Sequence, residues 1–145
     1  MEQTGFSNGL PIIRQKPGST NSLGRVKFIF PNNYNIYFHD TPARSLFGEE
    51  KRAFSHGCIR LEKPDALAIY LLRDRPEWDP ERIAGAMRSD QEKWVPLESP
   101  MPVFISYFTA WVDGNGLLHF RDDLYGHDQK MGDRLFQKPS MALED

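Results

Sequence analysis

The sequence contains a single cysteine, Cys58, among its 145 residues. An internal disulfide framework and a zinc site built from cysteines alone are therefore excluded. Neither sign of charge dominates, because 18 Lys and Arg residues stand against 20 Asp and Glu residues, for a net charge of −2. This balance argues against a broad cationic surface for nucleic acid. The sequence also lacks an apolar run of about twenty residues, so no membrane-spanning helix is predicted.

The composition is that of a globular domain. Hydrophobic residues make up 39% of the chain, aromatic residues 12% and charged residues 26%, which is typical of a folded rather than a disordered chain. A chain of this length has room for one hydrophobic core, so we predict a single domain over residues 1–145. The polar residues 1–9 carry neither a basic start nor an apolar stretch, and we find no export signal in this chain.

Alternating apolar residues between turn signals predict two β-hairpins. The expected strands cover residues 25–30, 34–39, 103–112 and 117–121. The first pair turns at a Pro-Asn-Asn sequence, and the second pair turns at Asp-Gly-Asn-Gly, a strong hairpin signal.

Two helices are predicted, over residues 64–73 and 80–87, because each begins with proline and places apolar residues on one face. Prolines, glycines and polar clusters predict extended chain and turn over residues 10–21 and a long loop over residues 41–54. The segment after Tyr125 shows no clear period. The expected fold is therefore mixed α+β with short elements.

The cysteine lies in the segment Ser55-His56-Gly57-Cys58, and His39 precedes it by nineteen positions. A free thiol has a pKa of about 8.5, so nucleophilic chemistry at Cys58 requires a neighbouring base. His56 shares a side with Cys58 if the segment is extended, whereas a turn at Gly57 would separate the two side chains. His39 reaches the thiol only in a fold that brings the intervening loop back across its strand.

Gly57 adds a reason to consider acyl transfer. Because it has no side chain, a substrate carbonyl can approach the backbone, where the N–H groups of His56, Gly57 and Cys58 can bind an oxyanion. From the residues alone two interpretations stay open. Cys58 is either a nucleophile with histidine partners or a buried structural cysteine.

The spacing also places Tyr37 on the same side of the chain as His39, and Arg60 on the same side as Cys58. Tyr37 stands two positions before His39, so its ring is expected beside the imidazole, as a wall of an acyl pocket or as a core tyrosine. Arg60 stands two positions after Cys58 and can meet either a substrate carboxylate or a local acid.

These residues resemble the signature of a known family, the L,D-transpeptidase catalytic domain of the YkuD type. That signature is a histidine, a spacer, Ser/Thr-His-Gly-Cys, a hydrophobic residue, and Asn or Arg; His39 and residues 55–60 fit it. Arg60 and the flanking blocks, such as residues 37–42, are similar to the large multidomain periplasmic branch of the family. The similarity extends over about residues 10–128.

The resemblance implies a mainly β fold with two or so short helices, of the β-sandwich or barrel-like α+β kind, without its first strands. It implies that Cys58 is the nucleophile and that His39 is the general base and later the general acid. It also implies that the backbone carbonyl of Asp40 holds the imidazole, and that His56 and Gly57 line the oxyanion site with Cys58. The residues expected to bind substrate are Tyr37, Asp40, Ser55 and Arg60, with Ser55 as a supporting hydrogen bonder.

The resemblance further implies the reaction. Cys58 attacks the carbonyl between the L-centre of diaminopimelate and the terminal D-alanine of a peptidoglycan tetrapeptide stem, releases D-alanine, and passes the acyl group to a diaminopimelate amine. Water or a free D-amino acid as acceptor gives carboxypeptidase or exchange activity, and carbapenems acylate the same cysteine. The expected partners are peptidoglycan peptide stems, with no metal, no organic cofactor and no nucleic acid. The expected location is the periplasm or cell envelope.

In the large branch further strands precede the matched region, so we expect the chain to be a truncated or partial form, the C-terminal portion of the catalytic domain. Two alternatives accompany the enzymatic interpretation, and a non-catalytic remnant that binds wall peptide or a partner without turnover is the first. The second is a catalytic zinc site that uses His39, His56 and Cys58 as ligands.

Overall fold

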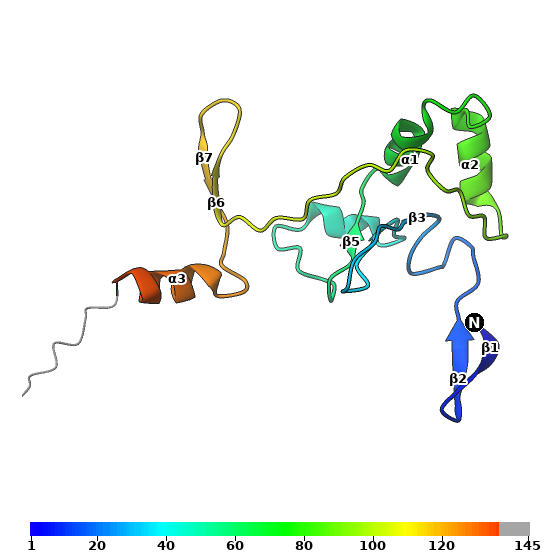
Figure 1. Cartoon of the computed structure of the whole chain (residues 1–145), viewed down its shortest axis with the longest axis horizontal. Coiled ribbons are helices and arrows are strands. Elements are labelled where there is room, and N and C mark those ends of the chain that lie inside the picture. The colour runs from blue at the N-terminus through cyan, green and yellow to red at the C-terminus, as the bar shows by residue number, and fades with distance from the viewer. Residues whose placement is uncertain (137–145) are drawn as a thin grey trace, which may run out of the picture. The chain divides into compact units, whose positions relative to one another are not determined.

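The computed structural model describes residues 1–136, and it confirms a mixed α+β fold in which small sheets alternate with short helices (Figure 1). The chain divides into two compact units, Met1–Met101 and Pro102–Asp145, and each is described by itself. The first unit contains Cys58 and both of the histidines in the family signature.

The first unit begins with a hairpin of β1 (Glu2–Ser7) and β2 (Leu10–Arg14), which pair antiparallel. Asn8 and Gly9 form its turn with positive φ angles of 50° and 77°, the conformation that Asn-Gly favours in two-residue hairpins. The extended chain expected from residue 10 corresponds to β2. The sequence reasoning assigned no element to β1.

A three-stranded sheet follows, with the order β3 (Lys27–Phe28), β4 (Phe38–His39) and β5 (Ile59–Arg60). β3 is antiparallel to β4, as the predicted hairpin requires, whereas β5 is parallel to β4. The strands are shorter than predicted. Asn32 accounts for part of this difference, because its side-chain oxygen accepts hydrogen bonds from the backbone N–H groups of Tyr34 and Ile36 and so draws the chain into a turn.

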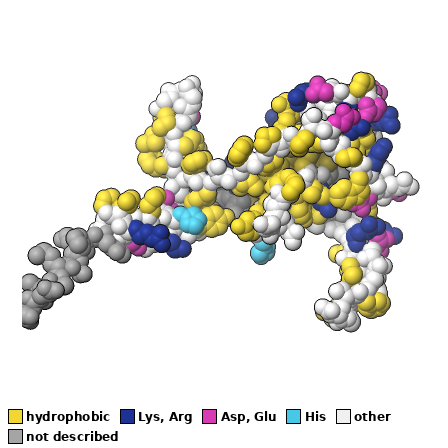
Figure 2. All heavy atoms as spheres, in the orientation of Figure 1, with side chains coloured by type: hydrophobic (Ala, Val, Ile, Leu, Met, Phe, Trp, Pro, Cys, Tyr) yellow, Lys and Arg dark blue, Asp and Glu magenta, His cyan; other side chains and the backbone are white. Residues whose placement is uncertain are grey.

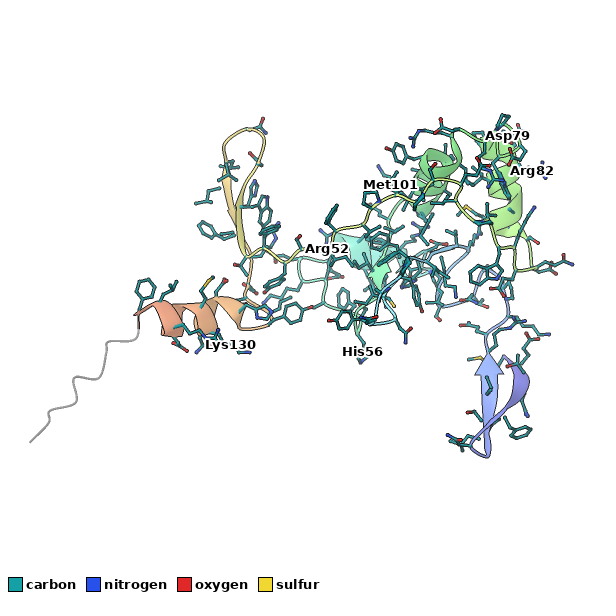
Figure 3. All side chains as sticks on the ribbon, in the orientation of Figure 1. Arg52, His56, Asp79, Arg82, Met101 and Lys130 are labelled. Carbon is teal, nitrogen blue, oxygen red and sulfur yellow. The ribbon has the colours of Figure 1, made fainter. Side chains whose placement is uncertain are left out.

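Two helices follow β5 in the chain and pack against each other. α1 (Pro64–Leu72) and α2 (Pro80–Arg88) confirm the predicted helices closely. Asp79 caps α2 by accepting a hydrogen bond of 2.7 Å from the backbone N–H of Arg82, and both residues lie together at the start of the helix in Figure 3. The buried hydrophobic core consists of Ala68, Leu72, Trp78 and Ile83, and Phe28 of β3 packs against it.

The segment between β4 and β5 is mostly loop, as predicted, and includes a short 3₁₀ helix, η1 (Arg44–Gly48). It carries the chain from the end of β4 back to a strand parallel to it. This return is the arrangement that His39 requires if it is to lie near Cys58.

The second unit contains a hairpin of β6 (Ala110–Val112) and β7 (Leu118–Phe120), joined by the predicted Asp-Gly-Asn-Gly turn. Asp113 holds the turn by accepting hydrogen bonds from the N–H groups of Asn115 and Leu117. Figure 2 shows hydrophobic side chains gathered over this hairpin, and Phe120 is 66% exposed. The strand predicted over 103–112 is confirmed only at its last three residues.

A third helix, α3 (His127–Phe136), ends the described part of the chain and was not predicted. The carboxylate of Asp123 accepts hydrogen bonds from the N–H groups of His127 and Asp128. The capping residue therefore stands four residues before the helix, and no residue of α3 is buried. Neither a helix-start signal at the usual distance nor a buried apolar face was present to indicate it.

Candidate active site

The pairing of β4 with β5 brings the two halves of the sequence signature together. Phe38 lies opposite Ile59, and His39 lies opposite Arg60. The N–H of Ile59 donates to the carbonyl of Tyr37 at 3.0 Å, so the pairing continues one residue beyond the strand ends.

This register determines which side chains share a face of the sheet. Residues opposite one another on paired strands point to the same side, and neighbours along a strand alternate. Tyr37 and His39 of one strand therefore share a face with Cys58 and Arg60 of the next. Phe38 points to the other side, where its ring lies 5.1 Å from that of Phe30.

The thiol of Cys58 is half-buried. Its sulfur donates to the carbonyl oxygen of Asn35 at 3.7 Å, and its other neighbour is the hydroxyl of Tyr37. Burial raises the pKa of Tyr37, and the hydrogen bond and charge of Cys58 raise it further. Tyr37 also meets His39 edge-on, with ring centroids 5.9 Å apart. Tyr37 thus contacts both members of the candidate nucleophile–base pair.

His39 is almost fully buried, with 4% of its surface exposed. Its Nδ1 lies 2.5 Å from the carbonyl oxygen of Asp40. A carbonyl oxygen can only accept, so Nδ1 carries the proton of the neutral ring and Nε2 carries the lone pair. The imidazole is therefore held in the tautomer that leaves Nε2 as its basic nitrogen.

The carboxylate of Asp40 fixes the backbone that holds His39. One oxygen accepts from the Arg44 guanidinium at 2.7 Å, and the other accepts from the backbone N–H of Arg25 at 2.9 Å. Gly24 approaches so closely that a Cβ there would lie 2.4 Å from the carboxyl carbon. Contacts with Arg44, Arg25 and Gly24 thus hold Asp40 from three sides. These contacts, the clamp on Asp40, also fix the position of its backbone carbonyl.

The turn before Cys58 is held by Ser55. Its hydroxyl donates to the carbonyl of Cys58 at 2.7 Å and accepts from the N–H of Gly57 at 3.2 Å. Gly57 has a φ of 150°, and a Cβ there would touch Ile36 at 3.4 Å, so a side chain is strained at this position. Because the Gly57 N–H already has an acceptor, the Cys58 N–H is the better placed of the two to bind an oxyanion.

His56 lies on the outer side of this turn. Its side chain is exposed and points away from the sheet in Figure 3. Within residues 1–136 it makes no hydrogen bond or ring contact. The structure therefore places Tyr37 beside both His39 and Cys58, and it leaves the side chain of His56 outside that group.

Arg60 is half-buried on the same face as His39. Its Nη1 is buried and has no hydrogen-bond acceptor among the described residues. A guanidinium nitrogen in this state loses its hydration without compensation from the described residues.

Lys27 is a residue of this face that the sequence reasoning did not select. It lies opposite His39 in the pairing of β3 with β4, and its ammonium sits 5.4 Å from the centroid of the Tyr37 ring. The alternation of residues 25–30 already placed Lys27 on the side away from Phe28. The sequence does not show the register between β3 and β4, which sets Lys27 opposite His39.

A cavity of about 470 Å³ lies beside Asp40, Arg44 and Pro64 and contains neither Cys58 nor His39. Within residues 1–136 no group of three or more His, Cys, Asp or Glu side chains is placed to hold a metal ion. In the same part of the chain no helix combines the length and apolar character needed to cross a membrane.

Comparison with known proteins adds two findings. Residues 2–105 match the family model YkuD, L,D-transpeptidase catalytic domain. A protein of Haemophilus influenzae (strain ATCC 51907 / DSM 11121 / KW20 / Rd), named "Putative L,D-transpeptidase", is 39% identical over 119 residues. That alignment covers 82% of this chain and 24% of the relative, so the chain spans about a quarter of the length of the protein that it matches.

Proposed function

The chain belongs to the YkuD family of L,D-transpeptidase catalytic domains, and from this premise we propose that it is a cysteine-dependent L,D-transpeptidase of peptidoglycan. The proposed donor is a tetrapeptide stem, cleaved between the L-centre of diaminopimelate and the terminal D-alanine. The observation that carries the proposal is the parallel pairing of β4 with β5, because it sets Tyr37 and His39 on the same face as Cys58.

In the first proposed step, Nε2 of His39 takes the proton of the Cys58 thiol. The sulfur attacks the scissile carbonyl, a carbon–sulfur bond forms, and the bond to the D-alanine nitrogen breaks. His39 then returns its proton to the leaving amine, which gives a thioester and free D-alanine. The contact between Nδ1 and the carbonyl of Asp40 supports this assignment, because it holds the basic nitrogen of His39 in one tautomer.

The tetrahedral intermediate carries a negative oxygen that needs donors. We assign the Cys58 N–H to this role, with the backbone of His56 and Gly57 forming the rest of the site, as the family resemblance implies. Gly57 contributes its conformation and its lack of a side chain, since its N–H is bonded to Ser55. The Ser55 hydroxyl supports the turn that presents these groups.

In the second proposed step, an amine of another diaminopimelate attacks the thioester and forms a wall crosslink. Water in its place gives L,D-carboxypeptidase activity, and a free D-amino acid gives exchange. Tyr37 lines the acyl position beside the thiol, and Arg60 binds a carboxylate of the stem. The position of Arg60 opposite His39, on the same face as Cys58, supports this last role.

The proposed place of action is the periplasm or cell envelope, because that is where the peptide stems are. This assignment comes from the family, whose members act on peptidoglycan.

The experiment is to incubate the chain with a diaminopimelate-containing tetrapeptide and to measure D-alanine release together with the mass of the peptide products. The expected result is one D-alanine released for each crosslinked dimer or tripeptide formed, with no release by Cys58→Ser or His39→Gln. Release that persists in Cys58→Ser rules out the proposed nucleophile. Peptide binding without any release indicates a non-catalytic remnant.

A further inference from the structure

Three cationic or titratable side chains stand in one row across the central sheet. Lys27 of β3 lies opposite His39 of β4, and His39 lies opposite Arg60 of β5. Residues in such a row share a face. The face that holds the thiol of Cys58 is thus bordered by a lysine on one strand and an arginine on another.

The two cations differ in their surroundings. Arg60 is half-buried and one of its terminal nitrogens is fully enclosed. Lys27 is exposed, and its ammonium rests against the ring of Tyr37. No Asp or Glu among residues 1–136 forms an ion pair with Lys27. An exposed ammonium with an aromatic neighbour and no acid is held in place and still free to bind an anion.

The position of Lys27 fits a particular anion of the substrate. Because β4 lies between β3 and β5, the backbones at Lys27 and Cys58 are two strand spacings, roughly 10 Å, apart. The carboxylate of a terminal residue lies one residue, about 3.5 Å, beyond the bond that is cleaved, and the Lys27 side chain extends toward it over the Tyr37 ring. The Tyr37 ring spans the interval, because its hydroxyl meets the thiol while its face meets the lysine. A peptide that has its scissile carbonyl at Cys58 and runs across β4 toward β3 brings its terminal carboxylate to the Lys27 side of this face.

Resting on the proposed function, we propose that Lys27 is a specificity-determining residue that binds the terminal carboxylate of the donor peptide. Arg60 then binds a different carboxylate of the stem, since diaminopimelate carries one of its own. Lys27 selects stems that end in a free acid immediately after the scissile bond. It takes no part in the proton transfers.

The test compares two donors, the tetrapeptide acid and the same peptide with a terminal carboxamide, in wild type, Lys27→Gln, Lys27→Arg and Lys93→Gln. Lys93 is the matched control, because its ammonium lies 4.7 Å from the ring of Trp78 on the helical side of the unit. Wild type is expected to prefer the acid through a lower KM. Lys27→Gln is expected to raise KM for the acid roughly tenfold, the loss of one charge-assisted hydrogen bond, with KM for the carboxamide unchanged. Lys27→Arg and Lys93→Gln keep the preference.

Alkylation of Cys58 by iodoacetamide, an uncharged reagent, separates this role from an effect on the thiol. The rate is expected to be equal in wild type and Lys27→Gln. If Lys27→Gln slows both donors and iodoacetamide alike, or keeps the acid preference, the carboxylate role is wrong although the proposed function stands. If wild type releases no D-alanine from either donor but reacts with iodoacetamide, the proposed function fails instead.

Discussion

Replacing Gly24 by alanine tests whether the clamp on Asp40 holds the candidate base in place. Gly24 has a φ of 65°, and a Cβ there would lie 2.4 Å from the Asp40 carboxyl carbon. A positive φ costs an alanine about 1 kcal/mol and an overpacked contact adds about 1–3 kcal/mol, so we expect the variant to lose about 2–4 kcal/mol of unfolding free energy. Urea unfolding followed by tryptophan fluorescence, to which the buried Trp78 contributes, measures this loss.

Gly9→Ala is the matched control. Gly9 has a similar φ of 77°, but no atom lies within 4 Å of the position of its Cβ. It is expected to lose only the backbone part, about 1 kcal/mol. Because Asp40 holds the His39 ring, Gly24→Ala should also slow D-alanine release while Gly9→Ala does not. Equal losses of stability in the two variants, with equal activities, refute the clamp.

Two further predictions follow from local contacts. Ser55→Ala loses both hydrogen bonds of the turn at Gly57 and Cys58. The variant should slow D-alanine release roughly tenfold to a hundredfold, because the thiol is misplaced. Ser55→Thr keeps the hydroxyl and serves as the control, and equal rates for the alanine and threonine variants contradict the prediction. In the second unit, the hydrogen bond from His119 lowers the pKa of Asp113 below 3.8, and backbone N–H bonds lower it further. The stabilisation from this carboxylate is therefore present above about pH 4 and lost as pH falls through its folded-state pKa. NMR signals of the β6–β7 hairpin should lose dispersion in acid, and Asp113→Asn should abolish that pH dependence; an acid transition that survives in Asp113→Asn assigns it to another group.

The helices α1 and α2 could be predicted from sequence because their signals are local. Proline begins α1 and α2 alike, and Asp79 caps α2 three residues from its bond partner. The hairpin at Asp113 could be predicted for the same reason, since the residues of its turn bond to one another. The lengths of β3 and β4 could not be predicted, because the Asn32 side chain binds backbone N–H groups that would otherwise pair between the strands.

The candidate site could be predicted only in part from the sequence. The spacing of Tyr37 and His39 correctly indicates that their side chains lie together, since residues two positions apart on a strand point to the same face. The pairing of β4 with β5 depends on a loop return that no local pattern determines. For the same reason Lys27 was missed, because its place opposite His39 is a property of the register between two strands.

The central claim is that Cys58 is an activated nucleophile with His39 as its base. Intact-protein mass spectrometry after incubation with a carbapenem tests it most directly. The account predicts a mass increase equal to one carbapenem in wild type, none in Cys58→Ala, and a much slower increase in His39→Gln. An unmodified wild-type chain, or an adduct that survives in Cys58→Ala, contradicts it.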